Sequence, residues 1–138
     1  MNYGTLRDRY VQDSVSTASP ATLLIMLYDR LVLDLLRAEA ALNDGNKQQA
    51  SEQLMHAQDV VSELASTLDV DAWEGAKQLM SVYTFLLTTL VEANLEGDVT
   101  KVVACRELVE PLQDAWQQAA RQVAKAEPER SFGELGVA

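Results

Sequence analysis

The sequence predicts an all-α protein: an antiparallel four-helix bundle with a short N-terminal flap segment and a loose C-terminal tail. Three observations predict this fold. Glycine and proline are scarce, at 6 and 3 of 138 residues, whereas Ala, Leu, Gln and Glu are frequent. Apolar residues recur at spacings of three and four along four long stretches. Short turn signals separate these stretches, and helices with short connections pack as antiparallel neighbours.

The chain divides into three parts. Residues 1–18 form a mixed segment before the first strong helix start, and residues 19–126 are expected to form the bundle as one domain. Residues 127–138 lose the helical periodicity and contain one proline and two glycines, so we expect a flexible tail there.

The first helix, from about Pro20 to Asp44, has the clearest start. Ser19 supplies a hydroxyl N-cap, and Pro20 has a preset φ and no N–H to satisfy. One apolar stripe is expected to face inward: Leu23, Leu27, Leu31, Leu35, Ala38 and Leu42. A second apolar set lies largely outside that stripe: Leu24, Ile25, Met26, Tyr28, Val32 and Leu36. A bundle needs only one apolar face per helix, so the excess predicts that this helix holds an apolar segment of another protein.

The other three helices are expected at about Lys47 to Leu68, Ala76 to Glu96 and Val99 to Ala126. Gly45 and Gly97 are natural C′ residues for the first and third helices. The expected inward positions are Ala50, Leu54, Ala57, Val61, Leu64 and Leu68, then Leu79, Tyr83, Leu86, Leu90 and Ala93, then Val102, Cys105, Val109, Leu112, Trp116, Ala119 and Val123.

Pro111 lies inside the pattern of the fourth helix. Proline lacks an N–H and crowds the preceding turn, so we expect it to kink this helix or split it in two.

The N-terminal segment carries Tyr3, Leu6 and Tyr10 at positions i, i+3 and i+7, which share one face if the segment is helical. Two interpretations are open. The segment is a frayed terminus with incidental aromatic residues, or it is a short amphipathic flap that docks on the bundle.

Composition excludes several classes of function. The net charge is −10, from 21 acidic and 11 basic residues, and such a chain repels nucleic acid and anionic lipid surfaces. No apolar run reaches the roughly 18 residues of a membrane span, and the N-terminus has no apolar signal core. The single cysteine allows no internal disulfide, which fits a reducing compartment. We therefore expect a cytoplasmic protein with neither nucleic-acid binding nor membrane insertion.

No catalytic, metal-binding or cofactor-binding residue is expected. Glu52 and His56 are four residues apart, but ferritin-like sites need two Glu-x-x-His motifs, so we interpret them as a solvated surface pair. Cys105 has no nearby histidine and is expected to pack as a small apolar residue. A bundle enzyme for an anionic substrate would need arginines clustered in a cavity. The arginines compared with such a site are scattered and expected to be solvated: Arg30, Arg37, Arg106 and Arg121.

A series of motifs resembles the FliS family of flagellin export chaperones, in order and in spacing. The first part of the chain has Tyr10, Thr17-Ala18-Ser19-Pro20 and Met26-Leu27-Tyr28-Asp29. The second helix has Leu54, Ala57-Gln58-Asp59-Val60-Val61, Glu63-Leu64 and Leu68-Asp69. The third and fourth helices have Glu74, Leu79, Tyr83, Leu90, Ala93-Asn94-Leu95, Asp98 and Asp114-Ala115-Trp116. The chain departs from the family pattern at Ala72-Trp73, where Gly-Gly is frequent, and at Pro111.

The resemblance implies a cytoplasmic chaperone, not an enzyme, that binds the C-terminal segment of newly made flagellin. It implies that binding prevents premature polymerisation, and that flagellin is delivered to the export-gate protein of the flagellar type III export apparatus. It also implies that the N-terminal flap, with Tyr3, Leu6 and Tyr10, covers an apolar groove until cargo arrives. The flagellin-binding residues carried over from the motifs are Ile25, Met26, Asp29, Gln58, Tyr83, Asn94 and Trp116.

A second interpretation belongs to a different class. The same apolar excess would serve a helical bundle that forms a homo-oligomer and acts as a structural or regulatory module. The bundle enzyme is the third interpretation.

Overall fold

The computed structural model describes the backbone of residues 19–137 and the side chains of residues 19–125. The segment 1–18, with the expected flap residues Tyr3, Leu6 and Tyr10, lies outside the described residues. The described chain forms four helices and no strand, which confirms the all-α fold: α2 (Pro20–Asn43), α3 (Lys47–Thr67), α4 (Ala76–Glu96) and α5 (Val99–Val137).

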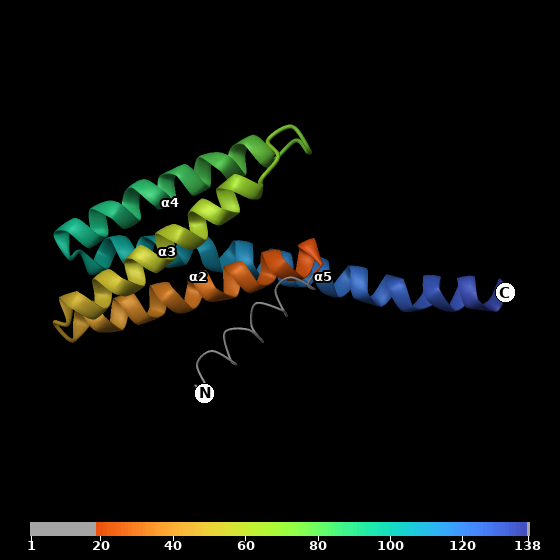
Figure 1. The fold of residues 1–138 in the computed structure, drawn as a ribbon, viewed down its shortest axis with the longest axis horizontal. Coiled ribbons are helices and arrows are strands. Elements are labelled where there is room, and N and C mark those ends of the chain that lie inside the picture. The colour runs from red at the N-terminus through yellow and green to blue at the C-terminus, as the bar shows by residue number, and fades with distance from the viewer. Residues whose placement is uncertain (1–18, 138) are drawn as a thin grey trace, which may run out of the picture.

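The four helices form a bundle whose two ends differ (Figure 1). α2 packs against α3 and α5, and α4 packs against the same two helices. Short turns at residues 44–46 and 97–98 close one end, which we call the closed end. At the other, open end lie the start of α2 and the longer loop 68–75, and α5 continues beyond the rest of the bundle.

The helix starts and stops follow from the expected caps. The Ser19 hydroxyl oxygen accepts a hydrogen bond from the Thr22 backbone N–H at 3.2 Å, and Pro20 is the first helical residue. Gly45 and Gly97 have φ of 75° and 64°, a left-handed conformation that costs glycine little. Local chemistry therefore sets the bounds of α2 and α4 to within a residue of those expected.

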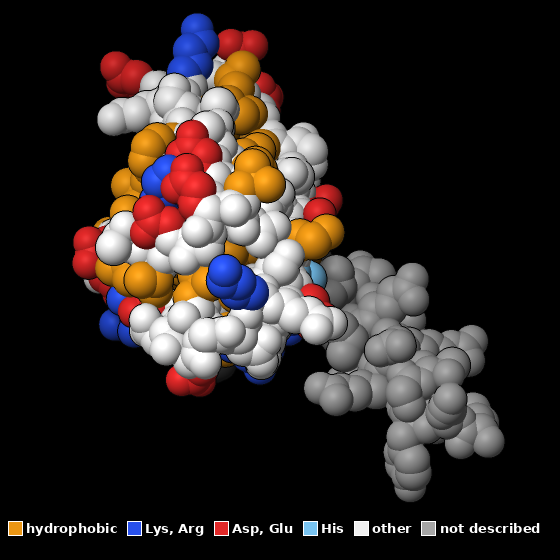
Figure 2. Space-filling view, turned by 90° about the vertical axis from the view of Figure 1, so that its left-hand side faces the viewer, with side chains coloured by type: hydrophobic (Ala, Val, Ile, Leu, Met, Phe, Trp, Pro, Cys, Tyr) orange, Lys and Arg blue, Asp and Glu red, His pale blue; other side chains and the backbone are white. Residues whose placement is uncertain are grey.

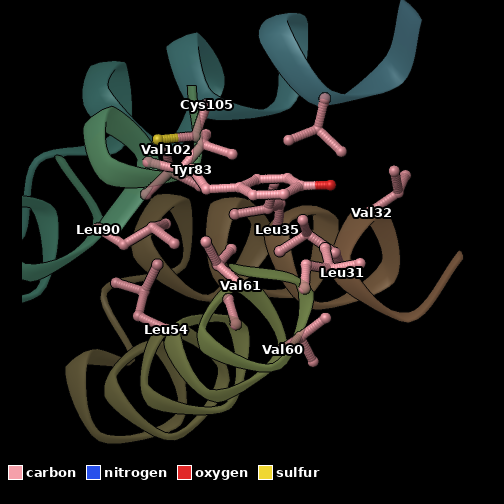
Figure 3. Packing of buried hydrophobic residues seen from close by; sticks show 14 of the residues in the cluster. Leu31, Val32, Leu35, Leu54, Val60, Val61, Tyr83, Leu90, Val102 and Cys105 are labelled. Atoms are coloured by element: carbon pink, nitrogen blue, oxygen red, sulfur yellow. The ribbon is translucent and has the colours of Figure 1, made fainter. Parts of the chain in front are cut away.

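The core runs along the centre of the bundle and contains side chains from all four helices (Figure 3). Tyr83 reaches from α4 across the cluster, between Cys105 of α5 and Leu35 of α2. Its hydroxyl lies 2.7 Å from that of Tyr28, which is also buried. Burial raises the pKa of both hydroxyls above the ordinary tyrosine value, so the pair stays neutral at physiological pH.

Two residues expected outside the inward stripe of α2 are buried instead. Tyr28 is 1% exposed and Val32 is 8% exposed. This part of the prediction is wrong because α2 packs against both α3 and α5, so its buried face is wider than one stripe. Met26 and Leu36 remain exposed, as expected.

A buried carboxylate joins α2 to α3. Asp34 is fully buried, and its two oxygens pair with Arg30 Nε at 3.0 Å and with His56 Nδ1. Glu52 and His56 are both exposed, as expected for surface residues, but His56 also contacts the buried Asp34. The partner lies 22 residues away in the sequence, beyond the reach of a spacing argument.

Arg30, Arg37 and Arg121 are exposed, as expected, whereas Arg106 is less solvated than expected. Arg30 pairs with Asp34, and Arg106 is partly buried between α5 and α2. Arg106 donates to Glu39 at 2.9 Å and to Glu110 at 2.6 Å. Each arginine neutralises nearby carboxylates, and the two lie in separate ion-pair groups.

Pro111 does not split α5, which runs without interruption from Val99 to Val137. Its ring is exposed to solvent, on the side of a helix where backbone hydrogen bonds lengthen most easily. The helix also continues past Ala126, so the loss of apolar periodicity over residues 127–137 does not end it.

The hydroxyl pair in the core predicts non-additive mutations. Tyr83→Phe leaves the Tyr28 hydroxyl buried without its partner, so we expect the free energy of unfolding to fall by about 1–3 kcal/mol. Tyr28→Phe should cost a similar amount. The double variant should lose clearly less than the sum, because neither hydroxyl is then left unpaired. Urea denaturation followed by circular dichroism measures this, and strict additivity would contradict it.

The buried thiol predicts slow chemical reaction. Burial raises the pKa of Cys105 to about 11, so at pH 8 the thiol is protonated and a poor nucleophile. We expect a disulfide reagent such as DTNB to react slowly with the native protein and quickly with the unfolded chain in guanidinium. Equal rates in both states would mean that Cys105 is accessible.

Candidate functional site

An apolar pocket of about 560 Å³ lies at the open end of the bundle. Its lining comes from the first turns of α2, the end of α3 and the 68–75 loop, with further side chains from α4 and α5. Its apolar lining comprises Pro20, Leu23, Leu24, Leu27, Leu64, Leu68, Ala72, Trp73, Leu79, Tyr83 and Trp116. A volume of this size is typical of ligand sites rather than of packing defects.

A second pocket of about 360 Å³ adjoins the first, between α2 and α5. Ile25 lines it on α2, and Ala120 and Val123 line it on α5. Leu24 and Trp116 line both pockets, so the two are parts of one depression. We call it the apolar groove; it extends from the 68–75 loop across the start of α2 to the protruding part of α5.

The groove is connected to the core through Tyr28, Trp116 and Asp29. The Trp116 ring packs against the Tyr28 ring at a centroid distance of 6.3 Å and an angle of 54°. Within the described part of the chain, the buried Trp116 indole nitrogen has no hydrogen-bond partner. Beside the groove, Asp29 Oδ1 accepts hydrogen bonds from the amides of Gln113 at 2.9 Å and Gln117 at 3.1 Å. These bonds hold α2 against α5 where the groove begins.

Three of the expected flagellin-binding residues line the groove: Ile25, Tyr83 and Trp116. Asp29 lies at its edge through its contacts with α5. Tyr83 lies at the bottom of the groove, since it is 1% exposed and belongs chiefly to the core.

The structure does not bring the other three expected residues into the groove. Met26 is 37% exposed on α2 but is not among the groove-lining residues. Gln58 is half-buried on α3, away from both pockets. Asn94 lies near the end of α4, at the closed end, where it lines a small hollow of about 80 Å³ beside Gly97.

Several groove residues were not singled out from the sequence. Leu23, Leu27 and Leu64 have the spacing of core residues, and no local signal separates them from the core positions further along. Ala119 and Val123 were expected to face inward but are exposed, and Val123 is 57% exposed. The usable signal is helix length, since the helix expected over residues 99–126 is longer than the one expected over residues 76–96.

The closed end has a different character. Lys101 pairs with Glu92 and with Glu96, each at 3.0 Å. Hydrogen bonds to Glu96 and Glu92 raise the pKa of Lys101, so its ammonium group stays charged. Figure 2, which looks onto this end, shows acidic and basic side chains beside one another, with apolar side chains between them. The apolar groove described above is at the other end of the molecule.

The described part of the chain was also compared with what a metal site and a membrane-spanning helix require. Over residues 19–125, no three His, Cys, Asp or Glu side chains gather as metal ligands would. No described helix combines the length and the apolar character that crossing a bilayer requires.

Comparisons with known proteins agree over most of the chain. Residues 2–123 match the model of a family described as flagellar protein FliS. A flagellar secretion chaperone FliS of Bacillus subtilis is 31% identical over 110 residues, which cover 80% of this chain and 82% of that protein. The protein of the same description from Escherichia coli is 30% identical over 111 residues, covering 79% of this chain and 82% of its own length.

A solved structure described as a flagellar chaperone from bacteria shares the fold, with a TM-score of 0.69 at 20% identity. It covers 88% of this chain, and 99% of that chain is matched in return. With the family match over residues 2–123 and the four-helix bundle, the conclusion follows that this chain belongs to the FliS family of flagellar secretion chaperones.

Proposed function

We propose that this protein binds the C-terminal segment of flagellin in the cytoplasm, keeps it from polymerising, and delivers it to the export gate of the flagellar type III export apparatus. The observation that carries the proposal is the apolar groove at the open end. It exposes leucines, Ile25 and two tryptophans that a self-contained bundle would bury. The descriptions of the relatives as flagellar secretion chaperones support the same function.

The groove suits an amphipathic helix. Its walls are aliphatic and aromatic, and recognition of a helix in such a groove uses apolar side chains at positions i, i+3, i+4 and i+7. A segment that is disordered before binding loses conformational entropy when it becomes helical. Burial of apolar surface on both partners is the term that offsets this cost.

The position of Ser19 supports a role for the preceding segment. Ser19 and Pro20 both line the groove, so the chain leaves the described structure at the groove itself. Residues 1–18 are therefore tethered beside the site at high effective concentration. In the proposed function this segment covers the groove when cargo is absent and moves aside when flagellin binds.

Self-association through the same groove is the competing function. Both functions use exposed apolar surface, and they differ in the partner that covers it.

Titration calorimetry with a C-terminal flagellin peptide tests the proposal directly. We expect saturable binding near one to one and a negative heat-capacity change between two temperatures, because apolar surface leaves water. Light scattering on the free protein is the companion measurement. No heat at either temperature, together with a mass that rises with concentration, would favour the self-associating module instead.

Alanine substitutions on α2 separate binding from folding. Ile25→Ala should weaken flagellin binding, by about fivefold to tenfold, and lower the melting temperature little, because Ile25 lines the groove and is only partly buried. Leu33→Ala and Met26→Ala are the matched controls, because Leu33 and Met26 are each 37% exposed on the same helix and do not line the groove. Their affinities should match that of the wild type. A larger loss of stability than of binding would identify Ile25 as a packing residue.

A further inference from the structure

The 68–75 loop presents an unusual aromatic residue. Trp73 is 49% exposed, yet it lines the larger pocket of the groove together with the leucines of α2. The Ala72 N–H donates to the Asp69 carbonyl at 3.1 Å, and the Ala76 N–H donates to the Trp73 carbonyl at 3.1 Å. Trp73 therefore lies between two hydrogen-bonded turns, so its backbone is held while its ring faces both solvent and groove.

The Trp73 ring lies directly over Gly75. A Cβ atom built on Gly75 would press on Cζ3 of the ring and lie 2.9 Å from Cε3, closer than side-chain carbons approach one another. The backbone of Gly75 has φ −84° and ψ −2°, which any residue can adopt. Glycine is thus required at this position for the placement of the ring and not for the turn of the chain.

We infer that Trp73 is a specificity-determining residue of the groove, where it selects a large apolar side chain of the bound helix, and that Gly75 is its positioning residue. The inference rests on the proposed function, because it concerns how the same groove chooses its occupant. It names the chemical class recognised at one subsite: an aliphatic side chain as large as leucine, packed against the indole.

Trp73 differs in its burial from the side chains at the bottom of this pocket. Tyr83, Leu79 and Leu64 line the bottom of the pocket but are 1–7% exposed, so they are needed for folding whatever occupies the groove. Trp73 is the large half-exposed side chain on the loop wall, and the core does not depend on it. Its ring is rigid and loses solvent on binding, which is characteristic of residues that dominate binding energy.

A double-mutant cycle tests the positioning role by calorimetry with the C-terminal flagellin peptide. Trp73→Ala and Gly75→Ala should each weaken binding by about tenfold, the first by removing the ring and the second by displacing it. The double variant should bind no more weakly than Trp73→Ala, because Gly75→Ala acts only through the ring. Losses that multiply in the double variant would overturn the role assigned to Gly75.

A control variant shows whether the loss of binding is specific to the groove. Phe85→Ala removes an aromatic residue of similar exposure, 53%, that lies on α4 outside the groove lining, so its affinity should not change. An equal loss with Phe85→Ala would overturn the inference. Thermal melts confirm that each variant is folded.

Peptides in which one apolar residue at a time is changed to alanine then locate the recognised side chain. At one large aliphatic position, the loss in affinity should be about tenfold with wild-type protein and much smaller with Trp73→Ala. Absence of such coupling at every position would overturn the selectivity. If wild-type protein binds the peptide and Trp73→Ala binds it equally well, the inference fails while the proposed function stands. If wild-type protein does not bind, the proposed function fails first.

Discussion

The contact between the Tyr28 and Tyr83 hydroxyls marks the place where the core ends and the groove begins. Tyr28 is the first fully buried residue of α2, and it contacts α4 through its hydroxyl and α5 through the Trp116 ring. On one side of it α2 is covered by two helices, and on the other side its leucines are only half-buried. The groove depends on this pair. Tyr83 lines the larger pocket, and Tyr28 contacts Trp116, which lines both pockets.

A protein that keeps apolar surface open needs other means to remain folded and dispersed. The buried Asp34 with Arg30 and His56, and the Arg106–Glu39 pair, join α2 to its neighbours away from the groove. Breaking such partly buried pairs costs stability because a charge is left without its partner. The net charge of −10 opposes association between copies, which offsets part of the attraction between exposed grooves.

The groove separates residues that serve the fold from residues free to serve recognition. Its bottom consists of core side chains, whose replacement would create cavities. Its rim consists of Ile25 on α2, Trp73 on the loop and Val123 on α5, which are half-exposed and can change without damage to the core. Such a division allows the choice of cargo to vary within one stable bundle.

The sequence by itself determined α2, α3 and α4, because caps and apolar spacing are local properties, but it did not determine that α5 continues to Val137. Ser19, Gly45 and Gly97 set helix ends within a residue of those observed, and the inward positions of α4 are all buried. Only the tertiary structure decided what covers each apolar face. The burial of Tyr28, the pairing of His56 with Asp34 and the exposure of Val123 all depend on neighbours distant in sequence or on where a neighbouring helix stops. Periodicity shows which residues share a face of a helix. It carries no information on whether another helix covers that face, so the residues that line the groove could not all be predicted from the sequence.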